Sequence, residues 1–389
     1  MLRHPARLAV SCAVVVATAL SLAAAPAGAD GPISCDADCQ AIQQTGQALV
    51  HRDGGPPGLI VLVDRAGAVT DFSFGTSTVG ASTPIAPTDH LRLASVSKAY
   101  SGAVALALVA KGTLHLSDTV GKRVHGLPKA WQDVTLAELL HHTSGIPDLI
   151  RSKAFAELLN ANPYDPPSRY GLVRFAFPLA MAFTPPGSSY RYSNTDNELV
   201  GLMVQAAGER SYEHELATLV TGPLGLADTT LPQGEDLPGP YAHGYAVKAG
   251  DPPADVTNVF SAGWSWASGG VVATPADVDR FIRAYASGSL TTKAAHAAQF
   301  HFRPGSSEPP GPGTNEAGLA IFRYSTRCGT VYGHTGNTLG YTQFAASTAD
   351  GSRSVVVQVN GQITPGNAPE AFAELQSVEG SAVCAALSH

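Results

Sequence analysis

The pattern of apolar and polar residues predicts strands at both ends of the chain and helices between them. Leu59–Val63 is continuously apolar and Val69–Phe74 alternates, with a turn at Arg65–Gly67, which is typical of a β-hairpin. The strands predicted near the other end are Val331–Gly336, Gly340–Ser347 and Arg353–Val359. Since one hairpin lies near the start and the other strands near the end, the simplest arrangement joins them in one sheet.

Helical patterns occupy the rest of the chain. The helices predicted from apolar periodicity and capping residues are Ala37–Arg52, a long helix from Ser95 to Ala110, Val134–Leu140, Asn197–Ala207, Pro275–Ala286 and Pro369–Ala385. Thr135 and Glu138 have the spacing of a capping box. Thr274 precedes Pro275 as the predicted N-cap of its helix. The long helix has no charge between Lys98 and Lys111, so we expect it to be buried.

These elements predict an α/β (α+β) fold. We expect an antiparallel sheet of about five or more strands, built from both chain ends and flanked by the N- and C-terminal helices, with a mostly helical lobe inserted. The sheet lobe would cover about 36–95 and 261–389, and the helical lobe about 96–260. No internal repeat is visible.

The first 29 residues have the pattern of an export signal. Arg3 and Arg7 supply the positive start, Leu8–Ala25 is apolar, and Ala27–Ala29 fits a cleavage site before Asp30. The apolar run is too short and too rich in alanine to predict a membrane span. We therefore expect a secreted domain of residues 30–389, cleaved near Ala29, without a stable membrane anchor.

Composition restricts the partners. The net charge is −7, with 31 acidic against 24 basic residues, which argues against nucleic acid. Outside the predicted signal there are four cysteines, Cys35, Cys39, Cys328 and Cys384, and the oxidising environment of exported proteins favours disulfides. Three pairings are possible, one of which joins Cys35 to Cys39 and Cys328 to Cys384. A zinc site is the alternative, but the spacing lacks C-x-x-C pairs with histidine partners.

A serine and a lysine three residues apart head the long helix. One helical turn would bring the side chains of Ser95 and Lys98 together. Burial favours the neutral form of a lysine, and a neutral amine can take a proton from a serine hydroxyl. The alternative is a helix start with a capping serine and a solvated lysine.

Two further motifs could carry chemistry. Tyr192 and Asn194 are two residues apart after a Pro-Gly turn, and would point the same way on an extended backbone. The alternative is a buried aromatic residue beside a turn asparagine. His334, Thr335 and Gly336 lie at the end of a predicted strand, where glycine allows another backbone to approach closely. The alternative is that His334 is a core histidine with its hydrogen bonds satisfied.

The adjacent His141 and His142 suggest metal ligands, but neighbours on a helix point about 100° apart. Packing and turn roles are the preferred interpretation of this pair.

The order S-x-x-K, Y-x-N, H-T-G resembles the serine-acylating family that includes penicillin-binding proteins and β-lactamases. The branch it resembles is that of exported serine D-alanyl-D-alanine carboxypeptidases of the class C β-lactamase superfamily. The resemblance covers nearly the whole chain after the predicted signal. Further stretches that carry it are Leu139–Pro147, Pro186–Asn194, Ser268–Val272 and Tyr332–Gly336.

The resemblance implies a role for each residue of the site. Ser95 would be the nucleophile, and Lys98 and Tyr192 would share the role of general base, with the proton acceptor left open. Asn194 would orient Lys98, and Tyr192 or His334 would protonate the leaving group. The substrate contacts implied are the backbone N–H groups of Ser95 and Asn337 as oxyanion hole, Thr335 and Gly336 beside the substrate carboxylate, and Trp264 along the cleft. No metal or cofactor is implied, and the disulfide implied is Cys328–Cys384.

Two positions depart from the resembled branch. Histidine stands where most relatives have lysine, and an unperturbed imidazole titrates near about 6.5, so we expect a cationic anchor at His334 that fades through neutral pH. The branch places a carboxylate-binding arginine on the preceding strand. Here Phe322 occupies that place and Arg323, the remaining candidate, is one residue away, which reverses its face.

The predicted activity is a D-alanyl-D-alanine carboxypeptidase that acts on peptidoglycan peptides and is acylated by β-lactams. The same residues fit a class C-like β-lactamase or an esterase, and a non-catalytic binding or sensor domain is a remote alternative. The predicted partners are a peptidoglycan stem peptide or a β-lactam, and we expect a monomer.

Overall fold

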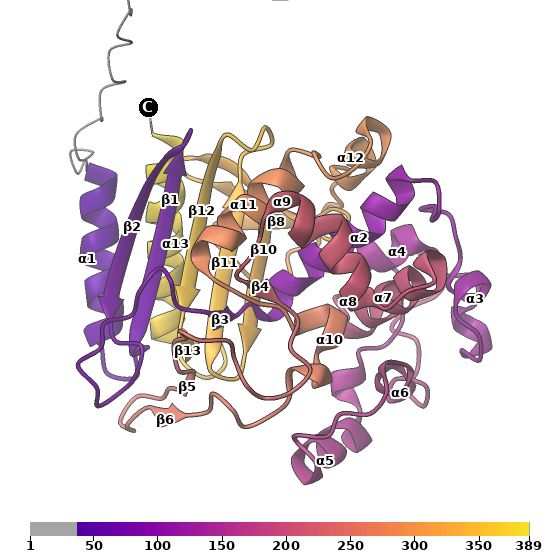
Figure 1. Ribbon diagram of the computed structural model, residues 1–389, viewed down its shortest axis with the longest axis horizontal. Helices are drawn as coiled ribbons and strands as arrows, with labels where there is room; N and C mark the ends of the chain where they lie inside the picture. Colours follow the sequence, from indigo (N-terminus) through magenta and orange to yellow (C-terminus); the bar gives the residue numbers. More distant parts are fainter. Residues whose placement is uncertain (1–36, 389) are drawn as a thin grey trace, which may run out of the picture. The chain divides into compact units, whose positions relative to one another are not determined.

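A seven-stranded antiparallel sheet organises the chain, in the strand order β2-β1-β12-β11-β10-β9-β8 (Figure 1). Its strands are β1 (Gly58–Arg65), β2 (Ala68–Gly75), β8 (Thr314–Ala317), β9 (Phe322–Thr326), β10 (Gly329–Thr338), β11 (Tyr341–Ser347) and β12 (Arg353–Val359). The computed structural model describes residues 37–388, which belong to one compact unit. The predicted signal peptide and Cys35 lie outside the described residues.

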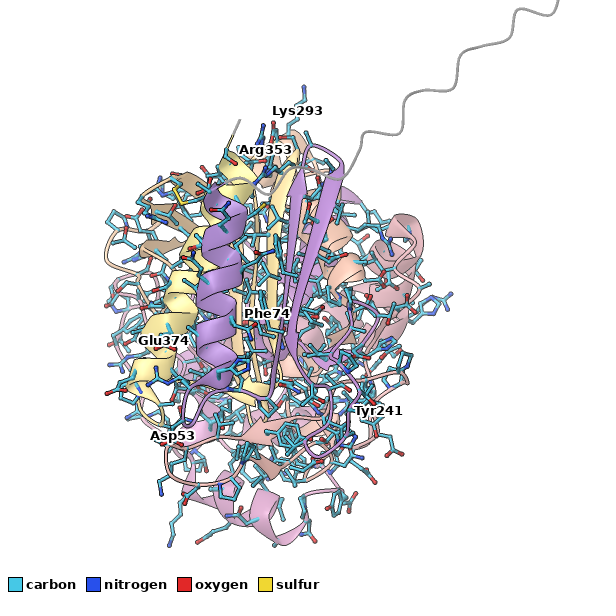
Figure 2. All side chains as sticks on the ribbon, turned by 90° about the vertical axis from the view of Figure 1, so that its left-hand side faces the viewer. Asp53, Phe74, Tyr241, Lys293, Arg353 and Glu374 are labelled. Atoms are coloured by element: carbon cyan, nitrogen blue, oxygen red, sulfur yellow. A yellow bond between two sulfur atoms is a disulfide. The ribbon has the colours of Figure 1, made fainter. Side chains whose placement is uncertain are left out.

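Helices cover both faces of the sheet. On one face, α1 (Ala37–His51) and α13 (Pro369–Leu387) pack against each other (Figures 1 and 2). On the other face lie α2 (Ser97–Ala110) and α11 (Pro275–Ala286). None of the helices within residues 37–388 is long and apolar enough to cross a membrane.

The strand register decides which side chains of β10 face which core. Thr335 pairs with Phe344, which belongs to the apolar core under α1 and α13. His334 pairs with Ala345, which belongs to the core under α2 and α11. Because paired residues share a face, β10 presents Thr335 toward α13 and His334 toward the helical side.

The remaining helices lie between β3 and β8 along the chain. They are α3 (Val120–Arg123), α4 (Leu136–Leu140), α5 (Lys153–Ala161), α6 (Arg169–Arg174), α7 (Asn194–Gly208), α8 (Tyr212–Leu216), α9 (Gly222–Leu224), α10 (Trp266–Gly269) and α12 (Lys293–Gln299). Short strands form two further three-stranded sheets, β3 (Leu91–Arg92) with β7 (Val272–Ala273) and β4 (Thr229–Thr230), and β13 (Gly361–Gln362) with β5 (Tyr245–Ala246) and β6 (Ala254–Asp255).

The predicted fold class is confirmed, and most predicted elements agree within a few residues. The capping box of Thr135 and Glu138 is present at α4. Thr274 and Pro275 begin α11 as expected, although the Thr274 side chain makes no capping hydrogen bond. The helix expected from Asn197 begins at Asn194, since Ser193 is its N-cap in extended conformation. Strand β8 was not predicted, because it follows a stretch rich in proline and glycine.

A disulfide joins Cys328, in the turn between β9 and β10, to Cys384 on α13. This is the pair implied by the resemblance. It ties the C-terminal helix to the hairpin that contains the H-T-G motif. The possible pairing of Cys35 with Cys39 cannot be followed, because Cys35 is outside the described residues.

Candidate active site

Ser95 lies in a 3₁₀ turn, Ala94–Val96, which leads directly into α2. The preceding Ala94 has φ 49°, in the left-handed region that side chains with a Cβ rarely adopt. Strand β10 approaches this turn closely, because a Cβ on Gly336 would lie 2.3 Å from the Leu93 carbonyl oxygen. The glycine of the H-T-G motif thus lets β10 reach the segment that carries the serine.

Lys98 is fully buried and uses its three N–H donors within the site. Its Nζ lies 3.1 Å from Ser95 Oγ, 2.7 Å from Asn194 Oδ1 and 2.8 Å from the Ser268 carbonyl oxygen. Burial lowers the pKa of Lys98 to about 8, although Asp148, Glu198 and Asp196 act in the opposite direction. A substantial fraction of this lysine is therefore neutral near pH 8 and able to accept a proton.

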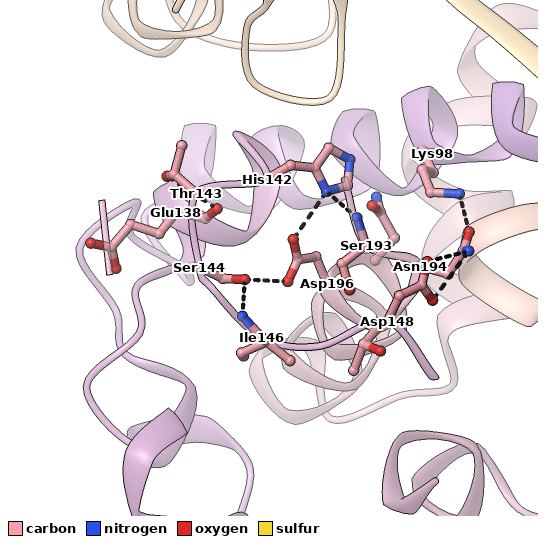
Figure 3. Close-up of polar contacts among 12 residues, drawn as sticks. Lys98, Glu138, His142, Thr143, Ser144, Ile146, Asp148, Ser193, Asn194 and Asp196 are labelled. Carbon is pink, nitrogen blue, oxygen red and sulfur yellow. Dashed lines mark hydrogen bonds and ion pairs between the residues drawn. The ribbon is translucent and has the colours of Figure 1, made fainter. Parts of the chain in front are cut away.

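Asn194 links the lysine to the half-buried carboxylate of Asp148 (Figure 3). Its Oδ1 accepts from Lys98, while its Nδ2 donates to Asp148 Oδ2 at 3.0 Å. Burial raises the pKa of Asp148, and the hydrogen bonds from Ile150 and Asn194 oppose that shift. As the first residue of α7, Asn194 has its orientation fixed by the helix and by these two partners.

Tyr192 lies over the lysine, with its hydroxyl near Ser95. The Lys98 Nζ is 5.0 Å from the centroid of the Tyr192 ring. The interaction of the hydroxyl with Ser95 opposes the effect of burial on its pKa, although no partner among residues 37–388 meets full hydrogen-bond geometry. Burial raises the pKa of Tyr192 far above its usual range. The phenol is therefore neutral and can donate a hydrogen bond or proton to a bound group.

His334 is buried, and it is not the titrating anchor expected from the sequence. Burial, reinforced by the charge of Lys98, lowers the pKa of His334 to about 3. Its Nδ1 is 2.5 Å from the Thr335 carbonyl oxygen, and its ring is 6.4 Å from the Tyr192 ring, centroid to centroid. The expectation of a cation that fades through neutral pH is wrong, because the imidazole is already neutral there.

Thr335 and Asn337 border the cleft beside Gly336. The Thr335 Oγ1 is buried next to the Tyr324 hydroxyl, without a partner in the described part of the chain that meets full hydrogen-bond geometry. The Asn337 side chain is tied away from the cleft, since its Nδ2 donates to Thr342 Oγ1 and the Ile363 carbonyl oxygen, and its Oδ1 accepts from Gln362. What Asn337 presents to a ligand is therefore its backbone.

The structure brings Trp264 to the cleft and separates Arg323 from it. Trp264 lines the cleft, packs against Phe155 and has a buried indole N–H without a partner in the described range. Arg323 pairs with Glu316 and lies over the Phe302 ring at 4.9 Å. The substrate contact predicted for Arg323 finds no support in this placement, because the side chain lines neither cavity and shares its face of the sheet with Tyr332.

Two cavities meet at the serine, and Ser95, Ile150, Asn194 and Asn337 line both. The first, of about 390 Å³, is lined by Tyr192 and Thr335 and is called the tyrosine cavity here. The second, of about 180 Å³, is lined by Phe155 and Trp264 and is called the tryptophan cavity. No lysine, arginine or histidine among residues 37–388 lines either cavity, whereas Asp148 and Glu379 line the first.

The paired histidines serve packing, as preferred from the sequence. His142 Nδ1 lies 3.0 Å from Asp196 Oδ2, and Ser144 donates to Asp196 Oδ1 at 2.6 Å (Figure 3). The His142 ring contacts the Tyr192 ring at 4.4 Å, so this network supports the tyrosine from behind. His141 instead bonds the His301 carbonyl oxygen. In the described range no three His, Cys, Asp or Glu side chains gather around a possible metal position.

The family is decided by a match over most of the chain. Residues 40–379 match the family model described as Beta-lactamase. The chain belongs to the β-lactamase family. It is similar to Protein flp of Staphylococcus aureus (strain MRSA252), with 28% identity over 218 residues that cover 54% of this chain. The match spans 42% of that protein, so the curated relative is much longer than the shared part.

Solved structures of β-lactamase-like fold support the architecture. The D-stereospecific amidohydrolase from Streptomyces sp. has a TM-score of 0.76 and 27% identity, covering 87% of this chain and 98% of its own. The D-amino acid amidase from Ochrobactrum anthropi SV3, complexed with D-phenylalanine, has a TM-score of 0.76 and 22% identity, covering 89% and 99%. The octameric penicillin-binding protein homologue from Pyrococcus abyssi has a TM-score of 0.69 and 23% identity, covering 86% of this chain and 75% of its own.

Three acids of this β-lactamase-family site were missed from the sequence. Asp148 directly follows Leu139–Pro147, one of the stretches that carry the resemblance, which was the only local signal for it. Glu198 lies behind Lys98, and burial raises its pKa to about 7. Glu379, on α13, gave no signal, since it reads as an ordinary helix glutamate.

Proposed function

We propose that this β-lactamase-family chain is a serine hydrolase that cleaves amide bonds through an acyl-enzyme on Ser95. The observation that carries the proposal is the 3.1 Å contact between Ser95 Oγ and the buried Lys98, whose pKa burial lowers to about 8. This pair supplies both the nucleophile and a base that is partly neutral at moderate pH.

In the proposed acylation, neutral Lys98 takes the proton from Ser95 Oγ as the oxygen attacks the substrate carbonyl carbon. The backbone N–H groups of Ser95 and Asn337 would receive the oxyanion, and one such donor is typically worth about 10²–10³ in rate. The C–N bond then breaks as the leaving amine receives a proton from the Tyr192 phenol, which is restored from the lysine ammonium. In the second half, Lys98 takes a proton from water as the water oxygen attacks the acyl carbon; the C–O bond to Ser95 then breaks, and Lys98 returns the proton to Ser95 Oγ.

Because the Tyr192 phenol stays neutral, Lys98 is the better candidate for the base. A tyrosinate would be needed for Tyr192 to accept the serine proton, and burial raises its pKa so that it stays protonated. Asn194, held between Lys98 and Asp148, would keep the amine directed at Ser95. Tyr192 is therefore assigned to the leaving group rather than to the nucleophile.

The cavities lack a cation that could bind a substrate ending in a carboxylate. No basic residue is present in the described lining, and His334 is neutral. The similar solved structures carry the names D-stereospecific amidohydrolase and D-amino acid amidase. We therefore propose amides of D-amino acids with a free amino group as the substrate class.

A D-alanyl-D-alanine carboxypeptidase is the second candidate. Thr335 lines the tyrosine cavity, and its hydroxyl is the group there that would bind a terminal carboxylate. Secretion remains a prediction from the N-terminal pattern, and it would give either activity access to cell-wall peptides.

The proposal is tested by hydrolysis of D-phenylalaninamide, L-phenylalaninamide and an N-acylated D-Ala-D-Ala peptide, each with wild type and Ser95→Ala. We expect the highest kcat/KM for the D-amide and no turnover by Ser95→Ala. A preference for the acylated dipeptide would replace the amidase with the carboxypeptidase. Turnover that survives Ser95→Ala would overturn the acyl-enzyme itself.

A further inference from the structure

The tyrosine cavity extends well beyond the reacting groups. Pairing of β9 with β10 ends at Gly333, so the cavity passes the edge of β10 at Thr335 and continues to α13. There its wall includes Phe372 and Glu379, which are seven residues apart and so share a face of the helix along roughly 10 Å. The cavity is therefore long enough to hold an extended arm.

The part of this cavity that α13 lines holds an acid without a partner. Glu379 is 4% exposed, and its carboxylate makes no hydrogen bond or ion pair with any residue in the range 37–388. Leaving a buried acid unpaired is costly, and it is unusual in a structural position. Since the side chain lines the cavity, a partner for it would arrive through the cavity.

The surroundings define the chemistry of that partner. The walls of the cavity also include the apolar Pro309, Pro310, Ile363 and Phe372. Tyr324, on β9, is a titratable group under the influence of Glu379, and burial keeps its phenol neutral. The raised pKa of Glu379 is caused by burial, and no charged residue of the described chain stabilises its ionised form. An apolar arm that ends in a cation fits both the apolar walls and the acid.

The position of Tyr192 indicates which half of the substrate binds in the tyrosine cavity. Tyr192, assigned above to the leaving amine, lines the tyrosine cavity and is absent from the lining of the tryptophan cavity. If the proposed acyl transfer holds, the acyl group occupies the tryptophan cavity and the leaving group occupies the tyrosine cavity. The geometry points to the tyrosine cavity as a subsite for leaving groups with an ammonium at the end of an apolar arm, with Glu379 as its counter-ion.

The test compares two leaving groups of matched size on one acyl group. The substrates are the n-hexylamide and the 5-aminopentylamide of D-phenylalanine, which differ by a methyl against an ammonium at the arm's end. Diamines of about three to six carbons with their alkyl counterparts give the length series. The quantity measured is the ratio of kcat/KM, amine arm over alkyl arm, because effects on steps that both substrates share cancel in it.

We expect wild type to favour the amine arm by at least about tenfold at the best length at pH 9, and Glu379→Gln to lose that preference. The matched control is Glu374→Gln, an acid on the same helix that is 41% exposed, pairs with Arg52 and lies outside the cavity lining (Figure 2). We expect its ratio to equal that of wild type. Equal ratios in wild type and Glu379→Gln, or an alkyl preference of wild type at every length, would overturn the subsite.

The ratio should also depend on pH. Burial raises the pKa of Glu379 to about 8, so about 1% of it is ionised at pH 6 and about 90% at pH 9. The amine preference of wild type should therefore increase by up to about two orders of magnitude over that range, and that of Glu379→Gln should stay flat. A preference that decreases with pH would contradict an ionised Glu379 as counter-ion.

Failure of the proposed function can be distinguished from failure of the subsite. If wild type hydrolyses neither D-phenylalaninamide nor its longer amides, acyl transfer to this class fails. The subsite is then tested by calorimetric binding of the same two amides to Ser95→Ala and to Ser95→Ala/Glu379→Gln. Tighter binding of the amine arm that depends on Glu379 supports the subsite, and equal binding by the two variants overturns it.

Discussion

Replacing Asp148 by asparagine should move the pH at which the site becomes active. Asp148 is the acid that most opposes the burial-driven decrease in the pKa of Lys98. An asparagine has nearly the same shape and can still accept the hydrogen bond from Asn194. The substitution therefore removes a negative charge while keeping the contacts that position the lysine.

The size of the effect follows from the hydrogen-bonded path. The Lys98 amine and the Asp148 carboxylate are joined through the Asn194 amide by bonds of 2.7 and 3.0 Å. This path puts the two charges roughly 7 Å apart, which at an effective dielectric constant of about 20 corresponds to about 2 kcal/mol. Since one pKa unit equals about 1.4 kcal/mol, the pKa of Lys98 should decrease by between one and two units.

The measurement is the pH dependence of kcat/KM for a neutral acyl substrate. Wild type should lose activity about tenfold per pH unit below about 8, because the protonated lysine cannot accept the serine proton. In Asp148→Asn this acidic limb should move to about pH 6–7, whatever happens to the plateau rate. Asp133→Asn, which removes the same charge from an exposed residue, should leave the limb in place.

An acidic limb of Asp148→Asn that stays with wild type, or moves to higher pH, would refute the electrostatic reasoning. So would a wild-type profile without a limb between about pH 6 and 9, since the neutral fraction of Lys98 would then not control the rate.

The remaining predictions concern stability. Because the pKa of His334 is about 3 in the fold against about 6.5 unfolded, stability should be lost as pH falls below about 6.5; chemical denaturation at pH 7.5 and 4 should show wild type losing about 3 kcal/mol more than His334→Gln. A Cβ at Gly336 would lie 2.3 Å from the Leu93 carbonyl oxygen, so Gly336→Ala should lower the free energy of unfolding by more than about 2 kcal/mol. The contrasting Gly380→Ala, on α13 with open space around its Cβ position, should raise it by up to about 1 kcal/mol, and the opposite order in thermal unfolding would contradict the packing.

The sequence was informative where chemistry depends on local spacing. Ser95 and Lys98 are one helical turn apart, and the turn alone brings them into contact. The capping box at Thr135 and the helix start at Thr274 and Pro275 are likewise local, and both lie where they were expected. The strands of β10, β11 and β12 follow from their apolar patterns, because one face of each is buried.

The sequence was less informative where the charge or position of a side chain depends on burial or on segments distant in the chain. The charge of His334 depends on how deeply its strand is covered, and no residue near it in the chain indicates that. Arg323 differs from a cleft residue by one position on a strand, and only the register shows that it faces Glu316. Glu379 reaches the cleft through the packing of α13 against the sheet, across a separation along the chain that no pattern reveals.

The most direct test of Ser95 as an acyl-accepting nucleophile activated by Lys98 is intact-mass spectrometry after incubation with benzylpenicillin. We expect a covalent adduct of the full mass of the drug on wild type, mapped by peptide digestion to the segment that contains Ser95. The adduct should be absent from Ser95→Ala and should form far more slowly on Lys98→Met. If it does not persist on wild type, loss of the drug from solution should show turnover instead. Neither adduct nor turnover in wild type, or an adduct that survives Ser95→Ala, would contradict the assignment of Ser95.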